Sequence, residues 1–181
     1  MSDDSWVSDS APYLRPHSGK APDAWTDEAA SRGRRGGQKT LSVATVAAPE
    51  DIRAALRLAP GAEVVVRSRL ILLDDAPVEL SDSYYPAAIA AGTRLADPRK
   101  IPGGAVKLLA ELGFTGEEHV EQVKAGTASR DQAALLDLEP DSPVLQLTRV
   151  NLTGEGVPFE VAIMTMPPQR HLTYRLRTGA R

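Results

Sequence analysis

The feature of this sequence that most restricts its fold is a pattern that occurs twice, once in each half of the chain. At an offset of 80 residues, the matched positions are Leu56, Leu58, Pro60, Val64, Arg69 and Leu72 on Leu136, Leu138, Pro140, Val144, Arg149 and Leu152. At an offset of 81, they are Pro77, Glu79 and Pro86 on Pro158, Glu160 and Pro167. Leu, Val and Pro are common and hairpins look alike, so chance similarity is the alternative. The ordered match of Arg, Pro-x-Glu and a final Pro favours duplication, which predicts a pseudo-twofold fold.

Each copy of the pattern predicts a helix followed by a hairpin. In the first copy, a helix begins after Pro49 with acidic residues in its first turn, and strands at 62–73 and 77–86 flank a turn. In the second copy, Ser129 and Gln132 form a capping box, and strands cover 143–152 and 158–167. A further helix covers 101–113, and a short strand covers 41–46. These elements predict an α+β fold with an antiparallel sheet and helices on one of its faces.

Composition excludes several functional classes. The chain has 181 residues, which fits one domain, and its formal net charge of −3 argues against a stand-alone nucleic-acid binder. Cysteine is absent, which excludes disulfides, thiolate metal sites and cysteine nucleophiles and fits a reducing compartment. No segment approaches the roughly 20 apolar residues of a membrane span. We therefore expect a cytoplasmic protein with no membrane contact.

Residues 1–40 differ in composition from the rest of the chain. They are rich in Ser, Asp, Gly, Pro and Arg, which predicts a linker-like arm before a domain at 41–178. One short helix is expected at 23–30, and Trp6, Tyr13 and Trp25 are expected to dock the arm on the domain. The basic cluster at 31–39 is either a solvated loop or an arm that contacts phosphates.

Two arginines on one predicted strand are candidates for anion binding. Arg67 and Arg69 are two residues apart, so their side chains leave the same face of the sheet, and guanidinium groups bind carboxylates and phosphates well. The alternative is an exposed ion pair between Arg69 and Glu79 across the hairpin. Glu79, Ser81 and Ser83 share one face of the next strand, and this polar stripe between apolar runs predicts a small-molecule pocket.

Other signals for chemistry are weak. The glycines before the helix at 101–113 include Gly104 and could bind an anion at the helix N-terminus, although a tight turn is the plainer explanation. Three scattered histidines give no metal-ligand or catalytic spacing. Glu79 and Glu160 could act as acid and base, but their symmetric positions favour an architectural role. We expect no cofactor, no bound metal and no enzymatic activity.

Three segments together resemble a known family. They are VVVRSRLILLDDAPVELSDSYYP, IPGGAVKLLAELG and GEGVPFEVAIMTMPPQRHLTYRL. In this order they resemble the UTRA domain, the effector-sensing half of GntR-type transcription regulators of the HutC subfamily, over about residues 41–176. The resemblance implies a chorismate-lyase-like α+β fold, homodimers, and a small acidic or phosphorylated effector that changes operator affinity.

The resemblance also implies roles for individual residues. Arg67 and Arg69 match the anion-binding arginines, and Glu79 and Glu160 match acidic residues that hold hydroxyl or amine groups. Gly104 stands where sugar-phosphate sensors have serine, and Val106 and Met166 stand where they often have tyrosine, which implies a more apolar pocket. The complete expected effector-binding set is Arg67, Arg69, Glu79, Ser81, Gly104, Glu160 and Met166.

The resemblance leaves three functions open. Family members carry an N-terminal winged helix of about 70 residues, which does not fit into the 40 residues before this domain. The chain is then an effector sensor that reaches DNA only indirectly, through a winged helix it does not itself contain. The alternatives are an interaction protein that heterodimerises with a full-length GntR-type regulator and an enzyme resembling chorismate lyase, which shares the fold.

Overall fold

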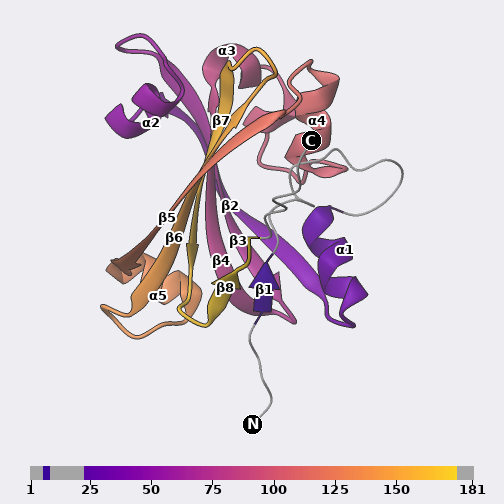
Figure 1. Ribbon diagram of the computed structural model, residues 1–181, viewed down its shortest axis with the longest axis vertical. Coiled ribbons are helices and arrows are strands. Elements are labelled where there is room, and N and C mark those ends of the chain that lie inside the picture. Colours follow the sequence, from indigo (N-terminus) through magenta and orange to yellow (C-terminus); the bar gives the residue numbers. More distant parts are fainter. Residues whose placement is uncertain (1–5, 9–22, 175–181) are drawn as a thin grey trace, which may run out of the picture.

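A six-stranded antiparallel sheet dominates the computed structural model, which describes residues 6–8 and 23–174 (Figure 1). In spatial order its strands are β2 (Gly36–Ala47), β3 (Glu63–Leu73), β4 (Ala76–Pro86), β7 (Pro158–Met166), β6 (Pro143–Leu152) and β5 (Glu118–Thr127). Two short strands, β1 (Trp6–Ser8) and β8 (Arg170–Leu172), pair in parallel beside it. The predicted α+β class and antiparallel sheet are confirmed.

The strand register confirms the internal repeat. In the first hairpin, Arg69 pairs with Ser81 and Ile71 pairs with Glu79; in the second, their counterparts in the repeat pair in the same way. Both hairpins also contain a bulge at the same place, after Ile71 in β3 and after its counterpart in β6. The strands β4 and β7 meet at the centre, so the two copies join there in one continuous sheet.

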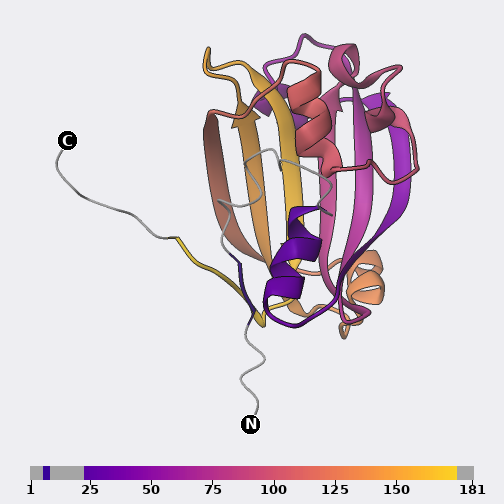
Figure 2. The same cartoon turned by 90° about the vertical axis from the view of Figure 1, so that its right-hand side faces the viewer.

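Helices lie on both faces of the sheet, not on one face as the sequence predicted. They are α1 (Ala24–Ser31), α2 (Glu50–Ala55), α3 (Ala87–Ala90), the 3-10 turn η2 (Arg94–Ala96), α4 (Gly104–Glu111) and α5 (Arg130–Leu136). Figure 2 shows α1 and α4 over one face. Leu109 of α4 packs with Val65, whereas Ile52 of α2 packs with the adjacent Val64. Because neighbouring strand residues point to opposite faces and both are apolar, each face needs its own cover.

The predicted helix starts are confirmed in detail. Ser129 and Gln132 exchange hydrogen bonds in a capping box at the start of α5. At the start of α4, Gly103 and Gly104 have φ angles of +80° and +82°, a backbone conformation that glycine adopts without strain. The glycine pair therefore makes the sharp entry into α4, which brings the helix N-terminus close to the sheet.

Two strands differ from the sequence prediction. β5 was not predicted; it is an edge strand with mostly exposed residues, so it has no apolar periodicity to reveal it. β2 begins at Gly36 and not at 41, because the glycines there pair with the end of β3. A Cβ atom at Gly36 would lie 2.9 Å from the carbonyl oxygen of Trp25, so glycine allows α1 to contact β2.

The segment before β2 is docked on the domain. Trp25 is 7% exposed and its Nε1–H donates to the carbonyl oxygen of Leu72 at 2.9 Å, which confirms its predicted docking role. Tyr13 and the side chain of Trp6 lie outside the described residues, as do the remainder of residues 1–22 and the end of the predicted domain at 175–178. In the described ranges, no helix is long and apolar enough to cross a membrane.

The basic cluster contacts the protein itself. Arg34 forms an ion pair with Asp74, and Arg35 with Asp75, both in the turn between β3 and β4. The backbone N–H of Arg35 also donates to the Asp74 carboxylate at 2.7 Å, which lowers the pKa of that carboxyl. These contacts favour the loop interpretation over the phosphate-contacting arm for residues 32–35, whereas residues 36–39, also predicted as loop, belong to β2.

Candidate functional site

A cavity of about 200 Å³ lies between the sheet, α1 and the start of α4. The four central strands supply its floor, because alternate residues of β3, β4, β6 and β7 point to the same face. The residues of these strands that line it are Arg67, Arg69, Ile71, Glu79, Ser81, Ser83, Tyr85, Leu147, Arg149, Asn151, Glu160, Ala162, Met164 and Met166. The cavity therefore spans both copies of the repeat.

Arg69 lines the cavity with a donor that no described residue uses. Its Nη2 donates to the hydroxyl oxygens of Ser81 at 3.0 Å and Ser83 at 3.1 Å, and its buried Nε has no acceptor within the part of the chain that the structure describes. The predicted alternative, an ion pair with Glu79, is not formed, because Arg69 lies opposite Ser81 in the register. An orphaned buried donor beside a cavity is costly unless something binds to it.

Arg67 lines the same cavity but has a different arrangement. It is 3% exposed, and its guanidinium donates to four backbone carbonyls in the loop around η2: Leu95 at 2.9 Å, Arg99 at 3.2 Å, Arg94 at 3.3 Å, and Asp97. Burial lowers the pKa of Arg67, and neighbouring Arg69 lowers it further. Arg67 therefore holds the loop that leads into α4 in place, and its positive charge lies at the cavity wall.

Glu160 is a buried carboxylate held by two donors. The hydroxyl of Tyr85 donates to its Oε1 at 2.8 Å, and the side-chain amide of Asn151 donates to its Oε2 at 2.6 Å. Burial and the adjacent Glu160 raise the pKa of Tyr85, so the phenol remains a donor. Because the Asn151 oxygen can only accept, His119 donates from Nδ1 to it at 2.8 Å. This network fixes the orientation of Glu160 at the cavity wall.

Glu79 faces the cavity without a hydrogen bond from any described residue. Burial raises its pKa, and the positive charges of Arg170, Arg69 and Arg149 partly offset that effect. Its repeat counterpart Glu160 accepts hydrogen bonds from Tyr85 and Asn151, whereas no residue that the structure describes donates to Glu79. The carboxyl group of Glu79 is thus directed to the cavity and not to a donor in the described part of the chain.

The roof of the cavity comes from α1 and the start of α4. Gly104, Ala105 and Val106 line it. The backbone N–H of Gly104 donates to the carbonyl oxygen of Ile101 at 3.0 Å, so the N–H groups of the first turn that have no acceptor among the described residues are those of Ala105 and Val106. Asp23 accepts from the backbone N–H of Thr26 and pairs with Lys100 at 3.1 Å, and these contacts outweigh burial and lower its pKa. The Asp23–Lys100 ion pair ties α1 to the loop that precedes α4.

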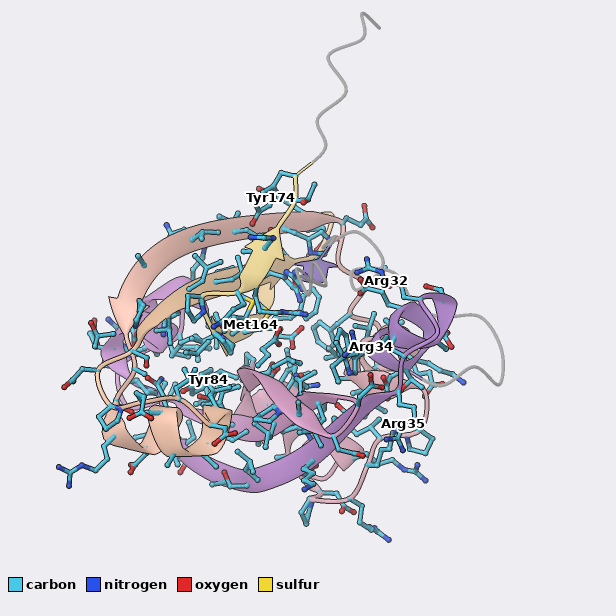
Figure 3. All side chains as sticks on the ribbon, turned by 90° about the horizontal axis from the view of Figure 1, so that it is seen from below. Arg32, Arg34, Arg35, Tyr84, Met164 and Tyr174 are labelled. Atoms are coloured by element: carbon cyan, nitrogen blue, oxygen red, sulfur yellow. The ribbon has the colours of Figure 1, made fainter. Side chains whose placement is uncertain are left out.

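The second copy of the repeat makes one side of the cavity apolar. Ala162, Met164, Met166 and Leu147 pack together and line the cavity, with Leu172 of β8 beside them. Figure 3 shows Met164 on the inside of the curved sheet, whereas the arginines of the 32–35 cluster lie on the α1 side. The cavity thus combines a polar end around Arg69 with an apolar end around the methionines.

All the effector-binding residues expected from the sequence line this one cavity: Arg67, Arg69, Glu79, Ser81, Gly104, Glu160 and Met166. Sequence reasoning missed Arg149, Arg170 and Trp25, which also line it. Arg149 could have been found, because it is the repeat counterpart of Arg69. Arg170, which lies 5.5 Å from the centre of the Trp25 ring, gave no signal, since the two residues are far apart in sequence. Residues 6–8 and 23–174 hold no group of three or more possible metal ligands.

The comparisons with known proteins match this chain over most of its length. The sequence profile of the UTRA domain matches residues 31–171. An HTH-type transcriptional regulator of Streptomyces coelicolor is 33% identical over 138 residues, which are 75% of this chain and 51% of that protein. This chain thus spans about half the length of the curated relatives it matches.

Solved structures share the fold. The effector domain of PhnF from Mycobacterium smegmatis has a TM-score of 0.74 at 19% identity, over 85% of this chain and 94% of that domain. The ligand-binding domain of a GntR-family regulator from Bordetella bronchiseptica has a TM-score of 0.69 at 28% identity, over 80% of this chain and 90% of that domain.

Proposed function

Because the chain belongs to the UTRA domain family of GntR-type transcription regulators, we propose that its cavity binds a small-molecule effector and that binding changes the activity of a transcription regulator. The binding of a ligand shifts a protein between conformations only if the ligand has different affinities for them. The cavity provides contacts on both sides for such a difference, since its floor is the sheet and its roof is α1 with α4.

The effector that fits best carries a carboxylate or phosphate. Arg69 offers guanidinium donors at the polar end, and the N-terminus of α4 adds backbone N–H groups and a positive dipole end. Glu79 can accept from a hydroxyl or ammonium group of the same ligand. The apolar end accommodates a body larger or less polar than a sugar phosphate, as Met166 and Val106 imply.

One observation carries the proposal: the buried Nε of Arg69 has no acceptor among the described residues, although the Nη2 of the same guanidinium donates to Ser81 and Ser83. Native mass spectrometry of the gently purified protein tests it, because any co-purified small molecule and the subunit number appear together. We expect a bound anion in the unmodified protein and its loss in Arg69→Ala. A matched control is Arg53→Ala on α2, which removes an arginine outside the cavity. Equal anion content in both variants would show that Arg69 does not bind the effector.

We also propose that the module is a homodimer, belongs to the HutC subfamily and acts in the cytoplasm. The alternative to the homodimer is a heterodimer with a full-length GntR-type regulator, whose winged helix would provide the contact with DNA. Mass spectrometry distinguishes a dimer from a monomer. Mixing with a full-length regulator and measuring operator binding tests the heterodimer. We propose a binding role and no catalysis, and release of pyruvate from chorismate would contradict this.

A further inference from the structure

The two copies of the repeat place one arginine each at equivalent positions of the cavity floor. Arg69 in β3 and Arg149 in β6 occupy the same register position in their hairpins, and both line the cavity. A duplicated site would therefore offer two anion-binding arginines. The two arginines differ in the residue that lies opposite each of them on the neighbouring edge strand, which is β2 for Arg69 and β5 for Arg149.

Arg149 has a carboxylate of its own. Glu121 lies directly opposite it in β5, and the Nε of Arg149 contacts its Oε1 at 2.6 Å. The two side chains are 10% and 11% exposed, so water screens this ion pair little. The charge of Arg149 is compensated inside the protein.

Among the described residues, no carboxylate forms an ion pair with Arg69, whose Nη2 donates only to serine hydroxyls. Thr40 occupies the position of Glu121 in the first copy, opposite Arg69 in β2, and it too lines the cavity. Across the other strand pair, Ser81 and Ser83 hold Arg69, whereas their counterparts are the apolar Ala162 and Met164. The first copy therefore surrounds its arginine with hydroxyl groups and gives it no ion-pair partner among the described residues, whereas the second copy pairs its arginine with Glu121 and places apolar side chains beside it.

From this divergence we infer that Thr40 determines where the effector's anion binds, and that the effector has a single anionic group at Arg69 and an apolar body toward Ala162 and Met164. The inference rests on the proposed effector-binding function and adds the orientation of the effector in the cavity. A glutamate at position 40 would recreate the Glu121–Arg149 pair around Arg69 and occupy the donors that the ligand needs. A ligand with a second anion at Arg149 would have to displace Glu121.

Arginine Nε–H resonances report which cavity arginine binds the anion. Each arginine side chain can be followed by nitrogen-15 NMR while inorganic phosphate is added as the probe anion. Arg69→Lys assigns the Arg69 signal. We expect phosphate to shift Arg69 in the unmodified protein and in Thr40→Gln, the uncharged control of similar size to glutamate. In Thr40→Glu we expect the affinity to fall about tenfold or more, the effect of losing one charge-assisted contact.

A second variant tests the inference without adding charge. Glu121→Gln removes the carboxylate beside Arg149, and we expect the Arg149 signal to become phosphate-sensitive. Two results would overturn the inference and leave the proposed function intact. One is equal phosphate affinity in Thr40→Glu and Thr40→Gln, and the other is an Arg149 signal that phosphate shifts in the unmodified protein. If phosphate shifts no cavity arginine of the unmodified protein, both fail.

Discussion

Removal of the Trp25 side chain is expected to release α1 from the domain and open the cavity. The ring is 7% exposed and packs with Ala29, Ile71 and Leu73, and its Nε1–H donates to the carbonyl oxygen of Leu72. Replacing a buried tryptophan by alanine costs about 3–5 kcal/mol from lost transfer energy and the remaining cavity. Trp25→Phe keeps most of the packing and loses the hydrogen bond, which costs about 1 kcal/mol.

Urea denaturation followed by circular dichroism measures both losses. Val157→Ala is the control, because Val157 is 49% exposed and truncation there should change the free energy of unfolding by no more than about 0.5 kcal/mol. If α1 detaches before the sheet unfolds in Trp25→Ala, the main transition exposes less surface. Its denaturant slope then falls together with the free energy of unfolding. A loss below about 1 kcal/mol in Trp25→Ala, with an unchanged slope, would refute the assignment of Trp25 as the anchor of α1.

Two further predictions concern Glu79 and Gly36. Burial raises the pKa of Glu79 above its ordinary 4.5, so this group favours folding below pH 4.5 and the benefit is lost as pH rises through the raised value. Glu79→Gln should therefore raise the melting temperature at pH 7 but not at pH 4, and an equal gain at both would contradict this. Gly36→Ala adds a Cβ atom 3.0 Å from that of Ala29 and should cost about 1–3 kcal/mol, whereas Gly33→Ala, which meets no atom within 4 Å, isolates the cost of backbone strain.

The role of Arg67 shows where sequence reasoning reached its limit. Its position on a strand two residues from Arg69 predicts the face correctly, because strand periodicity is a local property. Its partners are backbone carbonyls of a loop about 30 residues later in the chain. Backbone carbonyls carry no sequence signature, so only the folded structure shows that Arg67 holds a loop whereas Arg69 remains available.

What the sequence by itself determined is the repeated unit: two helix–hairpin copies, their turns, the capping box at Ser129 and the inward-facing residues of the central strands. These follow from local periodicity and from one copy constraining the other. Only the tertiary structure decided that Arg149 lies opposite the carboxylate of Glu121 whereas Arg69 lies opposite Thr40, since β5 is an exposed edge strand without apolar periodicity. It also decided that α1 closes the cavity, because a contact such as that of Trp25 with Leu72 depends on how distant segments pack together.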